Sequence, residues 1–128
     1  MSEEGITMPE TFTNNLLRIQ VSDENDSITV TWFGKSIMRN PGGFITPILV
    51  DVMSRGSDDE KRIILDFRKL EYMNSSSITP VIKILERARR GINQVTVLYE
   101  KSLRWQYLSF SALEIFETGD RRVEIKGS

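Results

Sequence analysis

The sequence predicts a single α/β domain in which a mixed β-sheet of four to five strands packs with three to four helices. Three observations carry this prediction. Residues 27–33 show the period-2 pattern of a strand, and a turn-rich segment separates them from a shorter strand candidate at residues 16–21, which is typical of an antiparallel hairpin. Two later segments repeat apolar residues at i, i+3, i+4 and i+7, the spacing of a helix with one buried face. A short, continuously apolar run between these two segments indicates a buried central strand.

Length and composition limit the possible functions. The chain has 128 residues, of which 39% are apolar and 27% charged, and a formal net charge of −1. These values indicate one globular domain and show no basic surplus for nucleic-acid binding. Cysteine and histidine are both absent, which excludes disulfides, thiolate nucleophiles, imidazole bases and Cys/His zinc sites. Without an apolar leader or a long apolar run, we expect a cytoplasmic, non-enzymatic protein that uses no membrane, metal or cofactor.

The predicted elements follow one another as β-β-α-β-α-β-α-β. Residues 1–15 are polar and acidic, and we interpret them as an N-terminal tail or arm, so that the domain spans residues 16–126. Strands are predicted at residues 16–21 and 27–33, and the turn-rich segment 22–26 between them predicts a hairpin.

The first helix is predicted from residue 45 onward, after a loop with strong helix breakers. Pro47 falls in its first turn, where a missing N–H costs little, and Gly56 is placed to end it. A buried strand follows at residues 62–67.

Pro80 places the start of the second helix at Ser77 or Ile78, because proline is tolerated within a first turn. Gly91 ends this helix, after three arginines that complement its dipole. The rest of the chain is predicted to form a strand, an aromatic-rich helical segment whose mixed periodicity suits two short helices, and a closing edge strand, at residues 94–99, 102–116 and 121–125.

Several motifs favour structural interpretations. Gly34-Lys35-Ser36 is similar to the end of a phosphate-binding loop, but Thr29 stands where that loop needs its first glycine. The carboxylate of Asp66 could serve in acid–base catalysis only in a cleft that raises its pKa, and a paired or solvated carboxylate is the simpler interpretation. The aromatic-rich segment could line a groove, but core packing is favoured.

A serine run connects the central strand to the second helix. Asn74, Ser75, Ser76 and Ser77 are all good N-cap residues, because their side chains accept hydrogen bonds from the first free N–H groups of a helix. One cap is sufficient, which leaves polar residues exposed ahead of the helix. A phosphoserine there would add a charge of roughly −1.5 to −2 to a surface that a partner can recognise. The residues alone leave both the capping and the phosphoacceptor interpretation open.

The same stretch resembles the signature of STAS domains, the anti-sigma-factor-antagonist family. The resemblance rests on LDF at residues 65–67, Leu70 and MNSSSI at residues 73–78. The family has an apolar strand, a short loop and Met-Asp-Ser-Ser-Gly-Leu opening a helix. The order and spacing of elements over residues 16–125, with Gly34 after the second strand, are also similar.

The resemblance implies a STAS-like fold and a non-enzymatic binding switch in a bacterial partner-switching pathway that regulates transcription. In the family, a partner serine kinase, often also the anti-sigma factor, phosphorylates the first serine after the aspartate and so releases the partner, and a phosphatase restores binding. That serine corresponds to Ser75, with Ser76 and Ser77 as secondary candidates. Asn74 stands where the family has aspartate, and Ser77 where it has glycine.

If the three central strands run parallel, the loops that follow them meet on one rim of the sheet. The predicted partner-binding residues on this rim are Gly34, Lys35, Ser36, Arg39, Asn74, Ser75 and Ser76. Lys35 and Arg39 are the candidates to contact an acidic partner or a phosphate on Ser75. The residues also leave open a constitutive scaffold module of the same fold, a small anion- or nucleotide-binding protein, and a homodimer.

Overall fold

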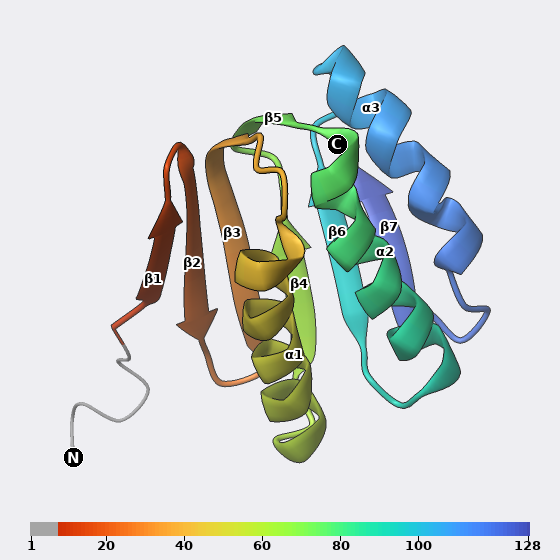
Figure 1. The fold of residues 1–128 in the computed structure, drawn as a ribbon. Helices are drawn as coiled ribbons and strands as arrows, with labels where there is room; N and C mark the ends of the chain where they lie inside the picture. Colours follow the sequence, from red (N-terminus) through yellow and green to blue (C-terminus); the bar gives the residue numbers. More distant parts are fainter. Residues whose placement is uncertain (1–7) are drawn as a thin grey trace.

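The computed structural model describes residues 8–128, whose strands and helices form one mixed sheet with helices packed against it (Figure 1). The strands are β1 (Glu10–Asn14), β2 (Leu17–Asp23), β3 (Ser27–Ser36), β4 (Arg62–Asp66), β5 (Leu70–Met73), β6 (Val95–Tyr99) and β7 (Val123–Gly127). The helices are α1 (Gly42–Asp58), α2 (Ser75–Arg90), α3 (Arg104–Phe110) and the 3₁₀ helix η1 (Ser111–Phe116).

The seven-stranded sheet has the order β1-β2-β3-β4-β6-β7, and β5 pairs with the end of β3. β1, β2 and β3 form an antiparallel meander, whereas β3, β4, β6 and β7 run parallel. The predicted α/β class, hairpin and closing edge strand are therefore confirmed.

The strand count exceeds the predicted four to five. β1 lies within residues 1–15, which the polar composition predicts as a tail or arm, so the sheet begins before the predicted domain boundary at residue 16. The predicted tail residues 1–7 lie outside the described residues. β5 lies in the segment predicted as a loop before the serines. Both strands are short, and neither shows a run of alternating apolar residues that a sequence pattern could reveal.

The helices cover one face of the sheet (Figure 1). Val30, Leu65, Val97 and Ile125 lie beside one another across four strands, and all are buried in a single core with the helices. Alternate residues such as Thr31 point to the opposite face, which carries no helix within residues 8–128. No helix in the described part of the chain is long and apolar enough to cross a bilayer.

An aromatic stack attaches α3 to the sheet. The ring centroids of Trp32 and Phe67 are 4.8 Å apart, and those of Phe67 and Phe110 are 4.6 Å apart. Gln106 is fully buried, and its Nε2 donates hydrogen bonds to the carbonyls of Phe67 (2.6 Å) and Leu70 (2.9 Å). α3 is thereby tied to the connection between β4 and β5. The predicted division of the aromatic-rich segment into two short helices is confirmed by α3 and η1.

α2 begins earlier than its proline predicts. It starts at Ser75, not at Ser77 or Ile78, so that Pro80 lies in the second turn. A proline there removes the N–H that would pair with the carbonyl of Ser76. That residue is exposed, so water can solvate the carbonyl, and the early start costs less than it would in a buried helix.

α1 also extends beyond its predicted limits. It starts at Gly42, which places Pro47 beyond the first turn, and it continues past Gly56 to Asp58. Gly56 is not the helix cap that the sequence predicts. A Cβ at this position would lie 2.8 Å from Cδ1 of Ile63. The glycine therefore allows α1 to approach β4 closely.

Candidate functional site

A buried hydroxyl network holds the N-terminus of α2. Asn74 has an extended backbone (φ −77°, ψ 166°), and its Oδ1 accepts hydrogen bonds from the Ser77 N–H (3.0 Å) and the Ser77 Oγ (2.6 Å). The Ser36 Oγ donates to the Ser77 Oγ at 2.6 Å. Both serine side chains are fully buried. Asn74 is therefore the N-cap, and the cap is fixed by a residue at the end of β3.

Asn74 also holds the loop that follows β3. Its backbone N–H donates to the Ser36 carbonyl at 2.9 Å, and its Nδ2 donates to the Met38 carbonyl at 3.3 Å. One amide side chain thus connects residues 37–41 to the start of α2. Because β3, β4 and β6 are parallel, the predicted meeting of their following loops on one rim is confirmed.

The three serines have different environments. Ser75 and Ser76 are exposed in the first turn of α2, whereas Ser77 is buried. Ser77 was a secondary phosphoacceptor candidate, and its burial in the hydroxyl network removes it from the accessible surface. Ser76 lines a different cleft, together with Arg39 and Lys83, between the N-terminal parts of α1 and α2.

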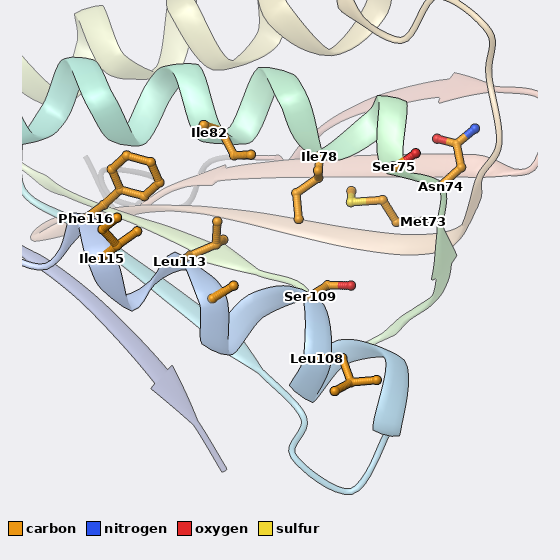
Figure 2. Close-up of a pocket in the computed structure, with 11 residues that line it drawn as sticks. Met73, Asn74, Ser75, Ile78, Ile82, Leu108, Ser109, Leu113, Ile115 and Phe116 are labelled. Carbon is orange, nitrogen blue, oxygen red and sulfur yellow. The ribbon is translucent and has the colours of Figure 1, made fainter.

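Ser75 lies instead at one end of an apolar groove of about 510 Å³, which we call the α2–η1 groove (Figure 2). Ile78 and Ile82 of α2 face Leu113 and Phe116 of η1 across it. Because the walls come from two helical segments packed on one core, the groove is part of the folded structure.

The composition of the aromatic-rich segment favours core packing, but part of the segment lies outside the core. Phe110 and Leu113 are buried, but Leu108 is 59% exposed and Ile115 is 70% exposed. Both exposed side chains line the α2–η1 groove. The mixed periodicity of this segment is the sequence signal that corresponds to the groove, because it places apolar residues on more than one helical face.

The predicted partner-binding residues divide into exposed and structural ones. Lys35 and Arg39 are exposed. Ser36 is fully buried and cannot contact a partner directly. Gly34 has φ 83°, and a Cβ there would lie 2.0 Å from the carbonyl oxygen of Leu16, so its position serves the close approach of two strands. Neither Lys35 nor Arg39 lines the α2–η1 groove, and their contact with a phosphate on Ser75 stays a prediction.

Asp66 is held by its neighbour Arg68. Two hydrogen bonds of 2.9 Å join the guanidinium to the two carboxylate oxygens, and the Arg68 N–H adds a third at 3.1 Å. Burial alone would raise the pKa of Asp66, but these hydrogen bonds and the charge of Arg68 bring it below its usual value. A general acid at neutral pH needs the opposite shift. Among residues 8–128, no cluster of three or more acidic side chains could hold a metal ion.

Solved structures with the same fold include two from Pseudomonas aeruginosa. One is a chain of the crystal structure of the diguanylate cyclase SiaD in complex with its activator SiaC, with a TM-score of 0.64 and 16% identity over 93% of this chain and 99% of that chain. The other is SiaC, with a TM-score of 0.64 and 18% identity over 95% of this chain and 100% of that chain. No family model and no curated protein matches the sequence. The likeness establishes the fold, and the STAS resemblance stays a prediction.

Proposed function

We propose that this chain is a non-enzymatic, protein-binding regulator whose contact with its partner at the α2–η1 groove is switched by phosphorylation of Ser75. The observation that supports this most directly is the position of Ser75. It is an exposed hydroxyl in the first turn of a helix, at the end of an apolar groove. A kinase can reach the hydroxyl, and a partner that fills the groove must cover it.

Phosphorylation at this position has opposite effects on the free and the bound chain. In the free chain, the phosphate adds roughly −1.5 to −2 charge at a helix N-terminus, where the helix dipole favours an anion. In the complex, apolar groups of the partner would have to remove water from that charge, which is costly without a compensating cation. The unphosphorylated form therefore binds, and the phosphorylated form releases the partner.

The similarity of fold favours an enzyme as the partner. SiaC is described as the activator of the diguanylate cyclase SiaD, and a chain of the same fold is suited to a similar role. We place it in the cytoplasm of a bacterium, in a partner-switching pathway, with a diguanylate cyclase or an anti-sigma-like regulator as the bound protein. A serine kinase and a cognate phosphatase set the state of Ser75.

Two measurements test the switch. Phosphopeptide mass spectrometry of the protein from its native cells should find phosphate on Ser75. A partner captured from those cells with the wild-type chain, and then purified, should bind Ser75→Ala with wild-type affinity. It should bind Ser75→Asp at least tenfold more weakly, measured by calorimetry.

Ser76→Asp is the matched control, because it adds the same charge one residue later, in the cleft lined by Arg39 and Lys83. It should leave partner affinity within twofold of wild type. Ile115→Lys tests the groove itself and should weaken binding without any change at Ser75. Equal binding by Ser75→Ala and Ser75→Asp would contradict the switch, and would favour the constitutive scaffold module.

A further inference from the structure

A second hollow lies at the same end of the sheet as Ser75 but is separate from the α2–η1 groove. It has a volume of about 620 Å³ and lies between the turn that joins β1 to β2 and the loop that follows β3. We call it the hairpin hollow. It is lined by Asn15, Leu16, Lys35, Ile37, Met38 and Arg39.

Two apolar side chains on its walls lack a structural explanation. Leu16 is 58% exposed and Ile37 is 51% exposed. Leu16 follows Asn15, whose φ of 53° suits the turn, but a leucine has no conformational role there. Single exposed apolar residues are ordinary, whereas two on one hollow form a surface that water solvates poorly.

Several contacts hold the hollow open in the folded chain. The Lys35 N–H donates to the Leu16 carbonyl at 3.0 Å, and Gly34 lets the two strands approach so closely. On the other side, the Asn74 side chain holds the Met38 carbonyl. One wall is thus held by a backbone hydrogen bond and the other by a side-chain hydrogen bond to a backbone carbonyl, so ordering them on binding would cost little.

The charges on the hollow have one sign. Lys35 and Arg39 are exposed, and neither forms an ion pair with another residue among 8–128. The lining contains no acidic residue. An occupant that matches this surface carries an aliphatic side chain flanked by carboxylates.

We propose that the hairpin hollow docks a short acidic–aliphatic segment of a partner protein. A membrane fits less well, because side chains that enter lipid project from a convex surface, and here the apolar residues line a concave one. A small molecule fits less well too, because such sites enclose most of their ligand, whereas Leu16 and Ile37 need an occupant that covers a broad surface.

A peptide titration of the full-length chain tests this proposal. The probe is Ac-Glu-Glu-Leu-Ile-Glu-Glu-NH2, and amide chemical shifts of the ¹⁵N-labelled chain are the readout. We expect saturable chemical-shift changes centred on residues 14–16 and 35–39. The affinity of the peptide should fall with added salt. Peptides with lysine in place of glutamate, or with Gly-Ser in place of Leu-Ile, should bind at least fivefold more weakly.

Substitutions on the protein give the second arm. The double variant Lys35→Glu, Arg39→Glu and the single variant Leu16→Ser should each weaken the peptide at least fivefold. The matched controls are Lys101→Glu, an exposed cation elsewhere, and Ile92→Ser, a 77% exposed isoleucine at the other end of α2. Neither control should change the affinity.

Four results would overturn the proposal. These are the absence of shifts, equal binding of the basic peptide, shifts in the same residues on raising the concentration of the chain alone, and binding to phosphatidylglycerol vesicles that Leu16→Ser abolishes. The third would assign the hollow to a second copy of the chain, and the fourth to a lipid surface. Ser75→Asp should leave the titration unchanged, so the outcome is independent of the proposed switch.

Discussion

The two ends of α2 are closed in different ways. At the N-terminus, Asn74 caps the helix with a neutral amide and leaves two of the first three side chains exposed. At the C-terminus, the guanidinium of Arg122 donates to the carbonyls of Ala88 (2.9 Å), Gly91 (2.8 Å) and Arg89 (3.1 Å).

Arg122 is held in turn by Asp120, whose carboxylate accepts from its Nε at 3.0 Å and from its backbone N–H at 3.1 Å. The C-terminal end is therefore fixed by charge-assisted hydrogen bonds from a distant segment of the chain. The N-terminal end is held by weaker, neutral bonds and presents free hydroxyls. A helix anchored firmly at one end can be modified at the other without losing its place.

Removing the Arg122 side chain from the C-terminal end of α2 should have the largest effect on the free energy of unfolding. Arg122→Ala removes the guanidinium donor from the carbonyls of Ala88, Arg89 and Gly91, so we expect the free energy of unfolding to fall by about 2–3 kcal/mol. Urea denaturation followed by circular dichroism measures this. Arg90→Ala is the matched control, because that arginine is also near the helix end but is exposed, and it should cost at most about 0.5 kcal/mol. Equal losses of stability in the two variants would mean that the positive charge near the helix end stabilises α2, and that the hydrogen bonds of Arg122 do not.

Removing the neutral cap should cost less. Asn74→Ala loses the acceptor for the Ser77 N–H and hydroxyl, and we expect a loss of about 1–2 kcal/mol. Asn74→Asp keeps the acceptor and adds a charge that the helix dipole favours, but it loses the donor to the Met38 carbonyl. These effects oppose each other, so the variant should stay within about 0.5 kcal/mol of wild type at pH 7. A double-mutant cycle of Asn74→Ala with Ser77→Ala should be strongly non-additive, because the two residues share one network. Simple additivity would show that the network is not cooperative.

A charge on the exposed first turn should change stability least among these substitutions. Ser75→Asp places a carboxylate near free N–H groups, so the free energy of unfolding should rise by up to about 0.5 kcal/mol. A thermal or urea melt of this variant checks the change. A clear loss of stability would show that Ser75 has a structural role, and that weakened partner binding by this variant cannot be attributed to the switch alone.

The smallest expected effect concerns pH at the fixed end. The neighbouring Thr118 hydroxyl and the hydrogen bonds from Arg122 lower the pKa of Asp120 from 3.8 to about 2. Because the folded-state pKa is lowered, the carboxylate favours folding above about pH 4, and this contribution is lost as the pH falls through about 2. A carboxyl NMR titration should give the value directly. In Arg122→Ala, the pKa of Asp120 should rise towards 3.8, and an unchanged value would assign the shift to Thr118 alone.

Local patterns in the sequence were sufficient for most of the fold. The spacing of Ile45, Ile48, Leu49 and Val52 predicts the buried face of α1, and all four are buried. The continuously apolar core of the segment 62–67 predicts a central strand, and β4 lies between β3 and β6. These signals are strong because each buried face repeats over several turns or residues.

The features that the sequence did not predict depend on contacts between distant residues. The predicted helix start is at the end of the serine run, whereas the observed N-cap is Asn74. Ser77 is buried there and bonded to Ser36, which lies 41 positions earlier in the sequence. Arg122 donates hydrogen bonds to the C-terminal carbonyls of α2, and no local sequence pattern predicts this contact. The exposure of Ser75 was predictable from the surplus of polar residues. The mixed periodicity of residues 102–116 indicates apolar side chains on more than one face, but the α2–η1 groove also needs the packing of α3 against Phe67, which no local spacing shows.

The bonds of Arg122 also have a consequence for the order in which the chain is made. Arg122 is synthesised 34 residues after Ala88, whose carbonyl it holds. At roughly 5–20 residues per second, α2 remains without its C-terminal donor for about 2–7 s of translation. During that interval, the amide cap at Asn74 and the apolar face of the helix are what support it. The end of α2 that carries the serines is therefore complete first, and the end that fixes it to the fold is complete only after Arg122 has been synthesised.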